Sequence, residues 1–392
     1  MRTVDAAGLP IGDDHPPRIM GVLNVSEESP YKPSVFDNSG EAAAYVDEQL
    51  IGQGADIVDV GLESANKRFD VLTAEQELDR LDRAIEAMES TSGDAVFSIE
   101  TRYHEVAEAA LSAGFEMVND ICGFADPEMP RVCAEYDVAV GKMASPPDLE
   151  RPGAITSVDD IYEALFQHGL TEKTLIDPAF GGWSEDKTLA DDRETFERLR
   201  EFRAIGQPLL VSLNRKNFLR EIAGRSTEEA LPVSLAATAM AVERGAHVVR
   251  THDVAETRDA ALIGHRFRRN RISETIGEMH IEECDVTTIE EARRHIKEVQ
   301  KHNEVTDKYT EGIDGVSAER PDPAGAVSRV YRLTGLDGET RQQIRSVAPD
   351  CGVLVAGVHA EGPHREMLLA GTVKSLRALT DTVDSLPRLD IS

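Results

Sequence analysis

The chain has 392 residues, of which 41% are hydrophobic and only 5% are aromatic, and its formal net charge is −30. This composition excludes disordered, collagen-like and disulfide-stabilised mini-protein classes. A surface this acidic repels polyphosphate, so we expect neither nucleic acid nor a membrane as a partner. The 72 acidic residues against 42 Lys and Arg are typical of proteins from concentrated salt, and an ordinary acidic enzyme is the alternative.

The N-terminal segment lacks the apolar run of a secretion signal, and no run approaches the about 18 apolar residues of a membrane-spanning helix. The four cysteines show no CxxC spacing. We therefore expect a cytoplasmic protein whose cysteines are buried structural thiols.

A short run rich in β-branched residues, a polar turn and a longer segment with helical periodicity recur along the first 270 residues or so. This alternation predicts eight strands, at residues 19–25, 56–61, 95–100, 116–120, 138–143, 174–177, 208–213 and 247–251. It predicts helices between them, among others at residues 40–53, 74–89, 104–113, 127–136, 193–203 and 227–243.

Strands that alternate with helices form parallel βαβ units, and eight such units over about 250 residues predict an α/β fold of the (β/α)₈ barrel type. A doubly wound open sheet is the alternative, although no GxGxxG motif follows the first strand. A barrel carries its active site at the carboxyl ends of its strands. Every predicted strand has polar residues at or just after this end, among them Asn24, Glu63, Glu100, Asn119, Lys142, Asp177, Lys216 and His252.

The pattern changes after about residue 275. An acidic stretch, an amphipathic helix near residues 288–301 and a linker containing Pro321 and Pro323 come next. We therefore predict a barrel at 1–275, a helix and acidic linker at 276–325, and a small α/β module of unknown function at 326–392. The module is expected to hold strands at 328–333, 352–358 and 366–370, and helices at 339–348 and 372–386.

Six blocks at the predicted strand ends resemble, in order, those of the dihydropteroate synthases and their pterin-binding relatives. The blocks are GVLNVSEES, GADIVDVGLESA, SIETRYHEVAEAALSAGFEMVNDICG, LIDPAFGGW, SLNRKNFL and VVRTHDV. The resemblance covers about residues 18–265 and does not extend to the C-terminal module. Each block is weak evidence alone, but their shared order is specific.

Dihydropteroate synthases condense 6-hydroxymethyl-7,8-dihydropterin pyrophosphate with p-aminobenzoate in folate biosynthesis and release pyrophosphate. The resemblance implies this transferase activity, with p-aminobenzoate or a related arylamine as acceptor and Mg²⁺ as cofactor. It also implies a homodimer formed through the outer helices of the barrel. Ionisation at the pterin methylene carbon and capture by an arylamine need no side-chain nucleophile, and the sequence offers no convincing one.

The pterin ring needs buried carboxylate and amide partners, because each unpaired polar group on its edge costs roughly 1–3 kcal/mol. The resemblance places pterin binding at Glu100, Asn119, Asp177 and Lys216, and Glu100 stands where the family has Asp. The structural alternative for Asp177 is a turn cap before Pro178.

The pyrophosphate departs more easily when cations and Mg²⁺ offset its developing charge. The resemblance places pyrophosphate binding at Asn24, Arg250 and His252, with Asn24 also touching the metal. Lys216, Arg250 and His252 are the expected catalytic residues. An ordinary loop histidine is the alternative for His252.

The arylamine side departs from the family pattern. The Ser-Thr-Arg-Pro loop of the family reads Ser64-Ala65-Asn66-Lys67 here, and the Ser before Arg-Lys is Asn214. Ser64, Lys67 and Asn214 are the residues at the matching positions, so the identity of the acceptor stays open. Two other functions remain possible at this point: a methyltetrahydrofolate-binding corrinoid methyltransferase barrel, and a degenerate pterin-binding scaffold.

Overall fold

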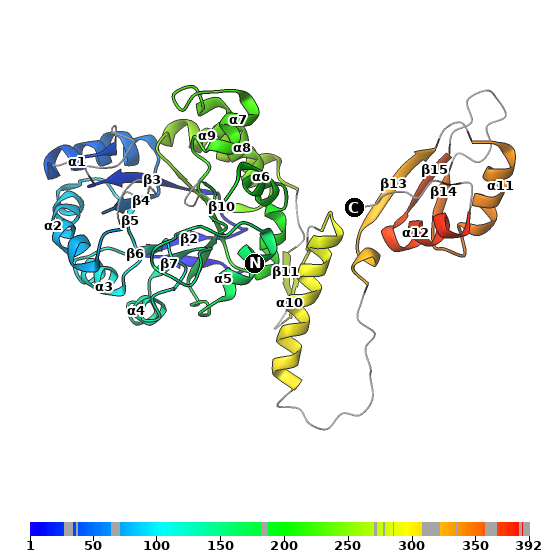
Figure 1. Ribbon diagram of the computed structural model, residues 1–392, viewed down its shortest axis with the longest axis horizontal. Helices are drawn as coiled ribbons and strands as arrows, with labels where there is room; N and C mark the ends of the chain where they lie inside the picture. The colour runs from blue at the N-terminus through cyan, green and yellow to red at the C-terminus, as the bar shows by residue number, and fades with distance from the viewer. Residues whose placement is uncertain are drawn as a thin grey trace. The chain divides into compact units, whose positions relative to one another are not determined.

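The computed structural model of this chain describes residues 1–26, 34–36, 38–63, 71–181, 187–269, 273–276, 279–284, 286–307, 322–333, 336–356, 367–383 and 386. The chain forms two compact units, Met1–Asn270 and Arg271–Ser392 (Figure 1).

Eight parallel strands of the first unit close into a barrel in the order β10-β3-β4-β5-β6-β7-β8-β9. The predicted (β/α)₈ fold is confirmed, and each observed strand begins and ends within two residues of its prediction. The strands are β3 (Arg18–Asn24), β4 (Ile57–Gly61), β5 (Val96–Thr101), β6 (Met117–Asp120), β7 (Ala139–Met143), β8 (Thr174–Asp177), β9 (Leu209–Val211) and β10 (Ala246–Thr251).

The barrel has two apolar layers. One fills its interior with side chains such as Met20, Ile57 and Leu175, and the other packs the strands against the outer helices. A hairpin of β1 (Val4–Ala6) and β2 (Leu9–Ile11) precedes the first barrel strand and was not predicted. Its apolar side chains join the interior cluster, so the hairpin closes the amino-terminal end of the barrel.

Helices follow the strands around the barrel (Figure 1). The segment predicted as one helix at 193–203 begins earlier, because Thr188 and Asp191 form a capping box at its start. The helical elements are α1 (Ser39–Tyr45), η2 (Val46–Leu50), η3 (Ile51–Gln53), α2 (Ala74–Ser90), α3 (His104–Ser112), α4 (Met129–Glu135), α5 (Val158–Phe166), α6 (Leu189–Glu197), η4 (Leu199–Ile205), α7 (Asn217–Ala223), α8 (Leu231–Glu243) and α9 (Val254–Phe267).

The second unit contains an antiparallel sheet in the order β13-β15-β14 and its own apolar core. The helix assigned to a linker segment by the sequence contributes Ala292 to this core. The elements of this unit are β11 (Ser273–Ile276), β12 (Met279–Glu282), α10 (Ile289–Asp307), η5 (Pro323–Gly325), β13 (Ser328–Leu333), α11 (Gly338–Val347), β14 (Leu354–Ala356), β15 (Met367–Thr372) and α12 (Val373–Thr382).

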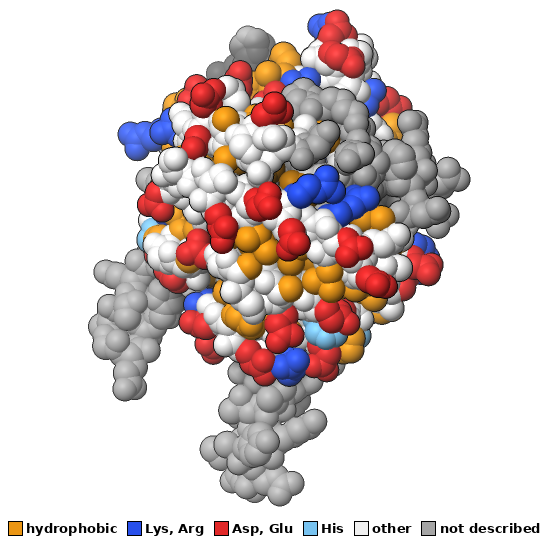
Figure 2. All heavy atoms as spheres, turned by 90° about the vertical axis from the view of Figure 1, so that its left-hand side faces the viewer, with side chains coloured by type: hydrophobic (Ala, Val, Ile, Leu, Met, Phe, Trp, Pro, Cys, Tyr) orange, Lys and Arg blue, Asp and Glu red, His pale blue; other side chains and the backbone are white. Residues whose placement is uncertain are grey.

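Three further features concern the helices, the cysteines and the surface charge. Among the helices of the described ranges, none has the length and apolar character needed to span a membrane. The expectation of four buried thiols is wrong in part, because Cys122 and Cys133 are buried but Cys351 is half-buried and Cys284 is exposed. Asp and Glu side chains outnumber Lys and Arg on the face of the molecule shown in Figure 2.

Candidate active site

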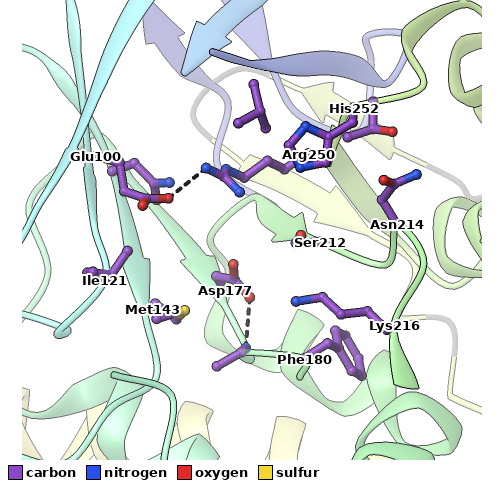
Figure 3. Close-up of a pocket in the computed structure, with 14 residues that line it drawn as sticks. Glu100, Ile121, Met143, Asp177, Phe180, Ser212, Asn214, Lys216, Arg250 and His252 are labelled. Carbon is purple, nitrogen blue, oxygen red and sulfur yellow. Dashed lines mark hydrogen bonds and ion pairs between the residues drawn. The ribbon is translucent and has the colours of Figure 1, made fainter. Parts of the chain in front are cut away.

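A cavity of about 160 Å³ lies at the carboxyl ends of the barrel strands. Parallel pairing places Glu100 of β5 beside Gly61 of β4 and Asn119 of β6. Polar residues at the ends of neighbouring strands therefore lie at the same level of the barrel. Ile121, Met143 and Phe180 supply apolar walls (Figure 3). Seven of the ten predicted site residues line this cavity: Glu100, Asn119, Asp177, Asn214, Lys216, Arg250 and His252.

Arg250 is held by two carboxylates. Its Nε donates to Asp59 Oδ2 at 2.7 Å, and an Nη donates to Glu100 Oε2 at 2.6 Å (Figure 3). Asn119 Nδ2 donates to the same Asp59 oxygen at 3.0 Å. Sequence reasoning missed Asp59, and the available signal was a carboxylate inside the otherwise apolar strand of GADIVDVG.

Burial and charge pairing act in opposite directions in this network. Burial raises the pKa of Glu100 to about 7, because Arg250 only partly offsets the loss of solvent and Asp59 adds repulsion. Burial alone would lower the pKa of Arg250, but Glu100 and Asp59 raise it above its ordinary value. Arg250 therefore stays cationic, and Glu100 takes up a proton more readily than an exposed glutamate does.

Asp177 ends β8, where it both caps a turn and lines the cavity. Its Oδ1 accepts a hydrogen bond from the Ala179 N–H at 2.7 Å, as a turn cap does, while the residue lines the cavity. Within the described chain, this is the carboxylate's sole hydrogen bond, so Oδ2 stays available to a ligand. Burial raises the pKa of Asp177 to about 6, against the opposing effects of the Ala179 N–H and of Lys216.

Lys216 extends into the cavity toward Asp177 (Figure 3). Gly181 makes room for it, because a Cβ on Gly181 would lie 2.8 Å from Lys216 Nζ. Burial lowers the pKa of Lys216 to about 8, although Asp192 and Asp177 favour its charged form. The amine is a cation at neutral pH that gives up its proton under mildly alkaline conditions.

His252 and Asn214 lie at the ends of β10 and β9. Burial and the nearby Arg250 charge lower the pKa of His252 to about 3, so its imidazole is neutral and offers hydrogen bonds without a charge. Asn214 Nδ2 donates to Asp253 Oδ2 at 2.8 Å. Asp253 also accepts two hydrogen bonds from Arg215, at 2.9 and 3.0 Å. The Arg215 side chain thus pairs with Asp253 and does not line the cavity.

Other residues singled out by the sequence lie elsewhere. Asn24 ends β3 and donates to Ser34 Oγ at 2.7 Å, outside the cavity lining. Lys142 lies near the carboxyl end of β7, but its buried side chain does not line the cavity, because Nζ donates to the carbonyls of Gln167 and Gly169. Ser64 and Lys67 lie outside the described residues.

A metal ion would find oxygen donors beside the cavity. Asn24 Oδ1 and Glu100 Oε1 lie 3.2 and 3.7 Å from the point where a Cβ on Gly61 would stand, so the two oxygens face one small space. Among the described residues, the one cluster of three potential ligands is His104, Glu105 and Asp126, none of which lines the cavity. A hard cation here would therefore need substrate oxygens to complete its shell, as is usual for Mg²⁺.

Comparison with known proteins agrees with this geometry. The family described as pterin binding enzyme matches residues 20–252. The probable bifunctional folylpolyglutamate synthase/dihydropteroate synthase of Halobacterium salinarum is 34% identical over 262 residues, which are 64% of this chain and 31% of that protein. The chain thus spans about a third of the length of this relative.

Two further relatives align over nearly their full length. Dihydropteroate synthase of Escherichia coli is 29% identical over 275 residues, 66% of this chain and 94% of that enzyme. The structure of dihydropteroate synthase from Thermus thermophilus in complex with 4-aminobenzoate has a TM-score of 0.56 and 28% identity, and the match covers 68% of this chain and 100% of that one. Because the family match spans the barrel and its cavity, this chain belongs to the pterin binding enzyme family.

Proposed function

We propose that the barrel condenses 6-hydroxymethyl-7,8-dihydropterin pyrophosphate with p-aminobenzoate or a related arylamine, releasing pyrophosphate, in folate biosynthesis. The observation that carries this proposal is one cavity whose lining brings together carboxylates, amides and two cations. Asp177 and Asn119 suit the hydrogen-bonding edge of a pterin, whereas Lys216 and Arg250 suit anionic and carbonyl groups.

In this mechanism, the carbon–oxygen bond to the pyrophosphate breaks and the pyrophosphate keeps the electron pair. The arylamine nitrogen then bonds to the methylene carbon and loses a proton to solvent or to the released pyrophosphate. Arg250 binds the departing anion through the guanidinium nitrogen that Asp59 and Glu100 leave available. His252 adds a neutral hydrogen bond, and holding both reactants in one cavity removes much of the entropy barrier.

We further propose Mg²⁺ as the cofactor. Asn24 Oδ1 and Glu100 Oε1 are oxygen donors of the kind that it prefers, and the phosphate oxygens of the substrate would fill most of its shell. When bound, the ion would offset charge on the pyrophosphate. We place the enzyme in the cytoplasm, where its substrates and Mg²⁺ are at hand.

The outer helices α8 and α9 carry large exposed apolar side chains. Phe267 is 77% exposed, Ile263 56% and Met240 46%. A soluble monomer gains nothing from such groups in water, so we propose that they pair in a homodimer. Sedimentation of the wild type and of Phe267→Asp tests this, with a monomer expected for the variant and a monomeric wild type as the contrary result.

Two substitutions test the proposed reaction. Arg250→Ala is expected to weaken the pterin pyrophosphate tenfold to a hundredfold, which corresponds to roughly 1.5–3 kcal/mol, and to leave the phosphate-free pterin nearly unaffected. Asp177→Asn is expected to weaken both ligands, because both contain the ring. Calorimetric titration measures these affinities.

A pyrophosphate-release assay with a panel of arylamines in molar salt measures the reaction, and no release with any arylamine would contradict the proposal.

A further inference from the structure

Asp59 occupies an unusual position under the cavity. It lies in the middle of β4, is fully buried and does not line the cavity. Its Oδ2 accepts hydrogen bonds from Arg250 Nε at 2.7 Å and from Asn119 Nδ2 at 3.0 Å. In the closed barrel, β4 stands two strands away from both β10 and β6, so one carboxylate oxygen ties together two ligand-facing residues across the interior.

The second oxygen argues against a role in stability alone. Asp59 Oδ1 is shielded from solvent and has no hydrogen-bond partner among the described residues. Such a buried, unsatisfied oxygen destabilises the fold, and apolar replacements of buried ion pairs are often neutral or stabilising. Of the two carboxylates that hold Arg250, Asp59 is the one that no ligand reaches, since Glu100 lines the cavity.

The hydrogen bond to Asp59 also fixes which way the Asn119 amide faces. A carboxylate only accepts, so the Asn119 nitrogen must face Asp59 and the oxygen must face away. The absence of a side chain at Gly141 accommodates that oxygen, because a Cβ there would lie 2.9 Å from Asn119 Oδ1. Asn119 therefore offers an acceptor, which selects a hydrogen-bond donor on the ligand.

We infer that Asp59 is a positioning residue that sets the Arg250 guanidinium for the pyrophosphate and the Asn119 amide for a donor on the pterin edge. This inference rests on the proposed function. It makes Asp59 the link between the two halves of the site, although Asp59 touches no substrate.

Asp59→Val tests the inference in the full chain, because it removes both acceptor oxygens from a similar volume. We expect the affinities for the pterin pyrophosphate and for the phosphate-free pterin both to fall at least tenfold, in calorimetric titrations. In an Arg250→Ala background, the further loss for the pyrophosphate ligand is expected to be smaller than in the wild type, because Asp59 acts partly through Arg250. Asp59→Asn keeps one acceptor oxygen, so it is expected to restore most of the phosphate-free pterin affinity.

Asp13→Val is the matched control. Asp13 also pairs with an arginine and a second side chain, Arg203 and His247, but at the amino-terminal end of the barrel. The Asp13→Val substitution is expected to lower Tm and to leave the affinities for both pterin ligands unchanged. Wild-type-like affinities for both ligands in Asp59→Val would overturn the inference. If the valine variant does not fold, a wild-type-like affinity for the pterin pyrophosphate in Asp59→Asn would overturn it instead. In either case, a wild type that binds and turns over leaves the proposed function standing. A wild type that binds no pterin overturns both.

Discussion

Loss of the Lys216 proton is expected to limit activity at alkaline pH. Burial lowers its pKa to about 8, and the cationic form that suits the pterin is present below this value and lost above it. We expect kcat/KM to fall as pH rises through about 8. Lys216→Arg keeps a charge that does not titrate in this range, so its profile should lose the alkaline limb while its rate is lower. An alkaline limb that persists in the arginine variant would assign the limb to another group.

Gly181 determines whether Lys216 reaches the cavity. Its φ of +125° lies outside the range that side chains favour, and an added Cβ would stand 2.8 Å from Lys216 Nζ. We expect Gly181→Ala to cost about 1–3 kcal/mol of stability and to weaken pterin binding. Gly206→Ala is the control, because Gly206 also has a positive φ, +79°, but no atom within 4 Å of the added Cβ. Thermal melts should show destabilisation in both variants, and titration should show a ligand effect only for Gly181→Ala.

The convergence of the cavity-lining residues was predictable, whereas their contacts with Asp59 were not. Polar residues such as Asp177 and Lys216 follow apolar runs, and strand ends of a parallel barrel must meet. Asp59 lies inside strand β4, and its position in the sequence does not reveal its hydrogen bonds to Asn119 on β6 and Arg250 on β10. His252 matched an anion-binding position, but its neutral state depends on burial and on Arg250, which the sequence order does not reveal.

At the scale of elements, the segment after the β1–β2 hairpin is fastened to the base of the barrel by Asp13. Arg203 donates two hydrogen bonds to its carboxylate, at 2.8 and 3.1 Å. The Leu209 N–H donates to His247 Nδ1, so Nε2 carries the proton that His247 donates to Asp13 at 3.1 Å. These partners outweigh the effect of burial and hold the pKa of Asp13 well below its ordinary range.

We expect Asp13→Val to destabilise the barrel by about 3–5 kcal/mol, because it leaves Arg203 buried without its anion. A depressed pKa contributes stability above the unfolded-state value, about 3.9, and loses it as pH falls toward the folded-state value. The difference in Tm between the wild type and the variant should therefore stay constant between about pH 6 and 8 and shrink below about pH 4. Equal stabilities at neutral pH would show that the segment is held by its apolar residues alone.

The elements that the sequence predicted best are those with the longest uninterrupted signals. The barrel strands are runs of β-branched residues bounded by glycine or polar residues, and all eight were located. The β1–β2 hairpin has strands of three residues, too short for any periodicity to register. The single helix expected at 40–53 passes through a π-helical stretch, Val46–Leu50, and ends as a 3₁₀ turn, because main-chain hydrogen bonding changes where side-chain periodicity does not.

At the scale of the whole molecule, the two units have separate apolar cores. Among the residues that the structure describes, the clusters of the barrel contain none beyond Ala261, and the cluster of the second unit contains none before Val286. The boundary between the two units, after Asn270, lies close to the change in sequence pattern after about residue 275. The sequence could not assign α10 to the second unit, since an amphipathic helix shows that it packs but not against what.

The whole-molecule property most open to experiment is the effect of salt. The chain carries 72 acidic and 42 basic residues, and the face in Figure 2 presents many Asp and Glu with few Lys or Arg. Exposed ion pairs, such as those of Arg131 with Glu128 and Glu135, add little stability and weaken in salt. The self-repulsion of −30 charges acts in the opposite direction, because screening relieves it.

We expect the repulsion to dominate, so Tm and activity should rise from about 0.1 M KCl, where the Debye length is about 10 Å, to above 1 M, where it is about 3 Å. Sucrose at matched osmolality is the control, because it is excluded from the protein surface but screens no charge. An equal rise in sucrose would assign the effect to exclusion, and a Tm already maximal at about 0.1 M KCl would show that the acidic surface is not an adaptation to concentrated salt. A rise specific to KCl is the result that electrostatic screening requires, since the local ion pairs can only lose stability as salt is added.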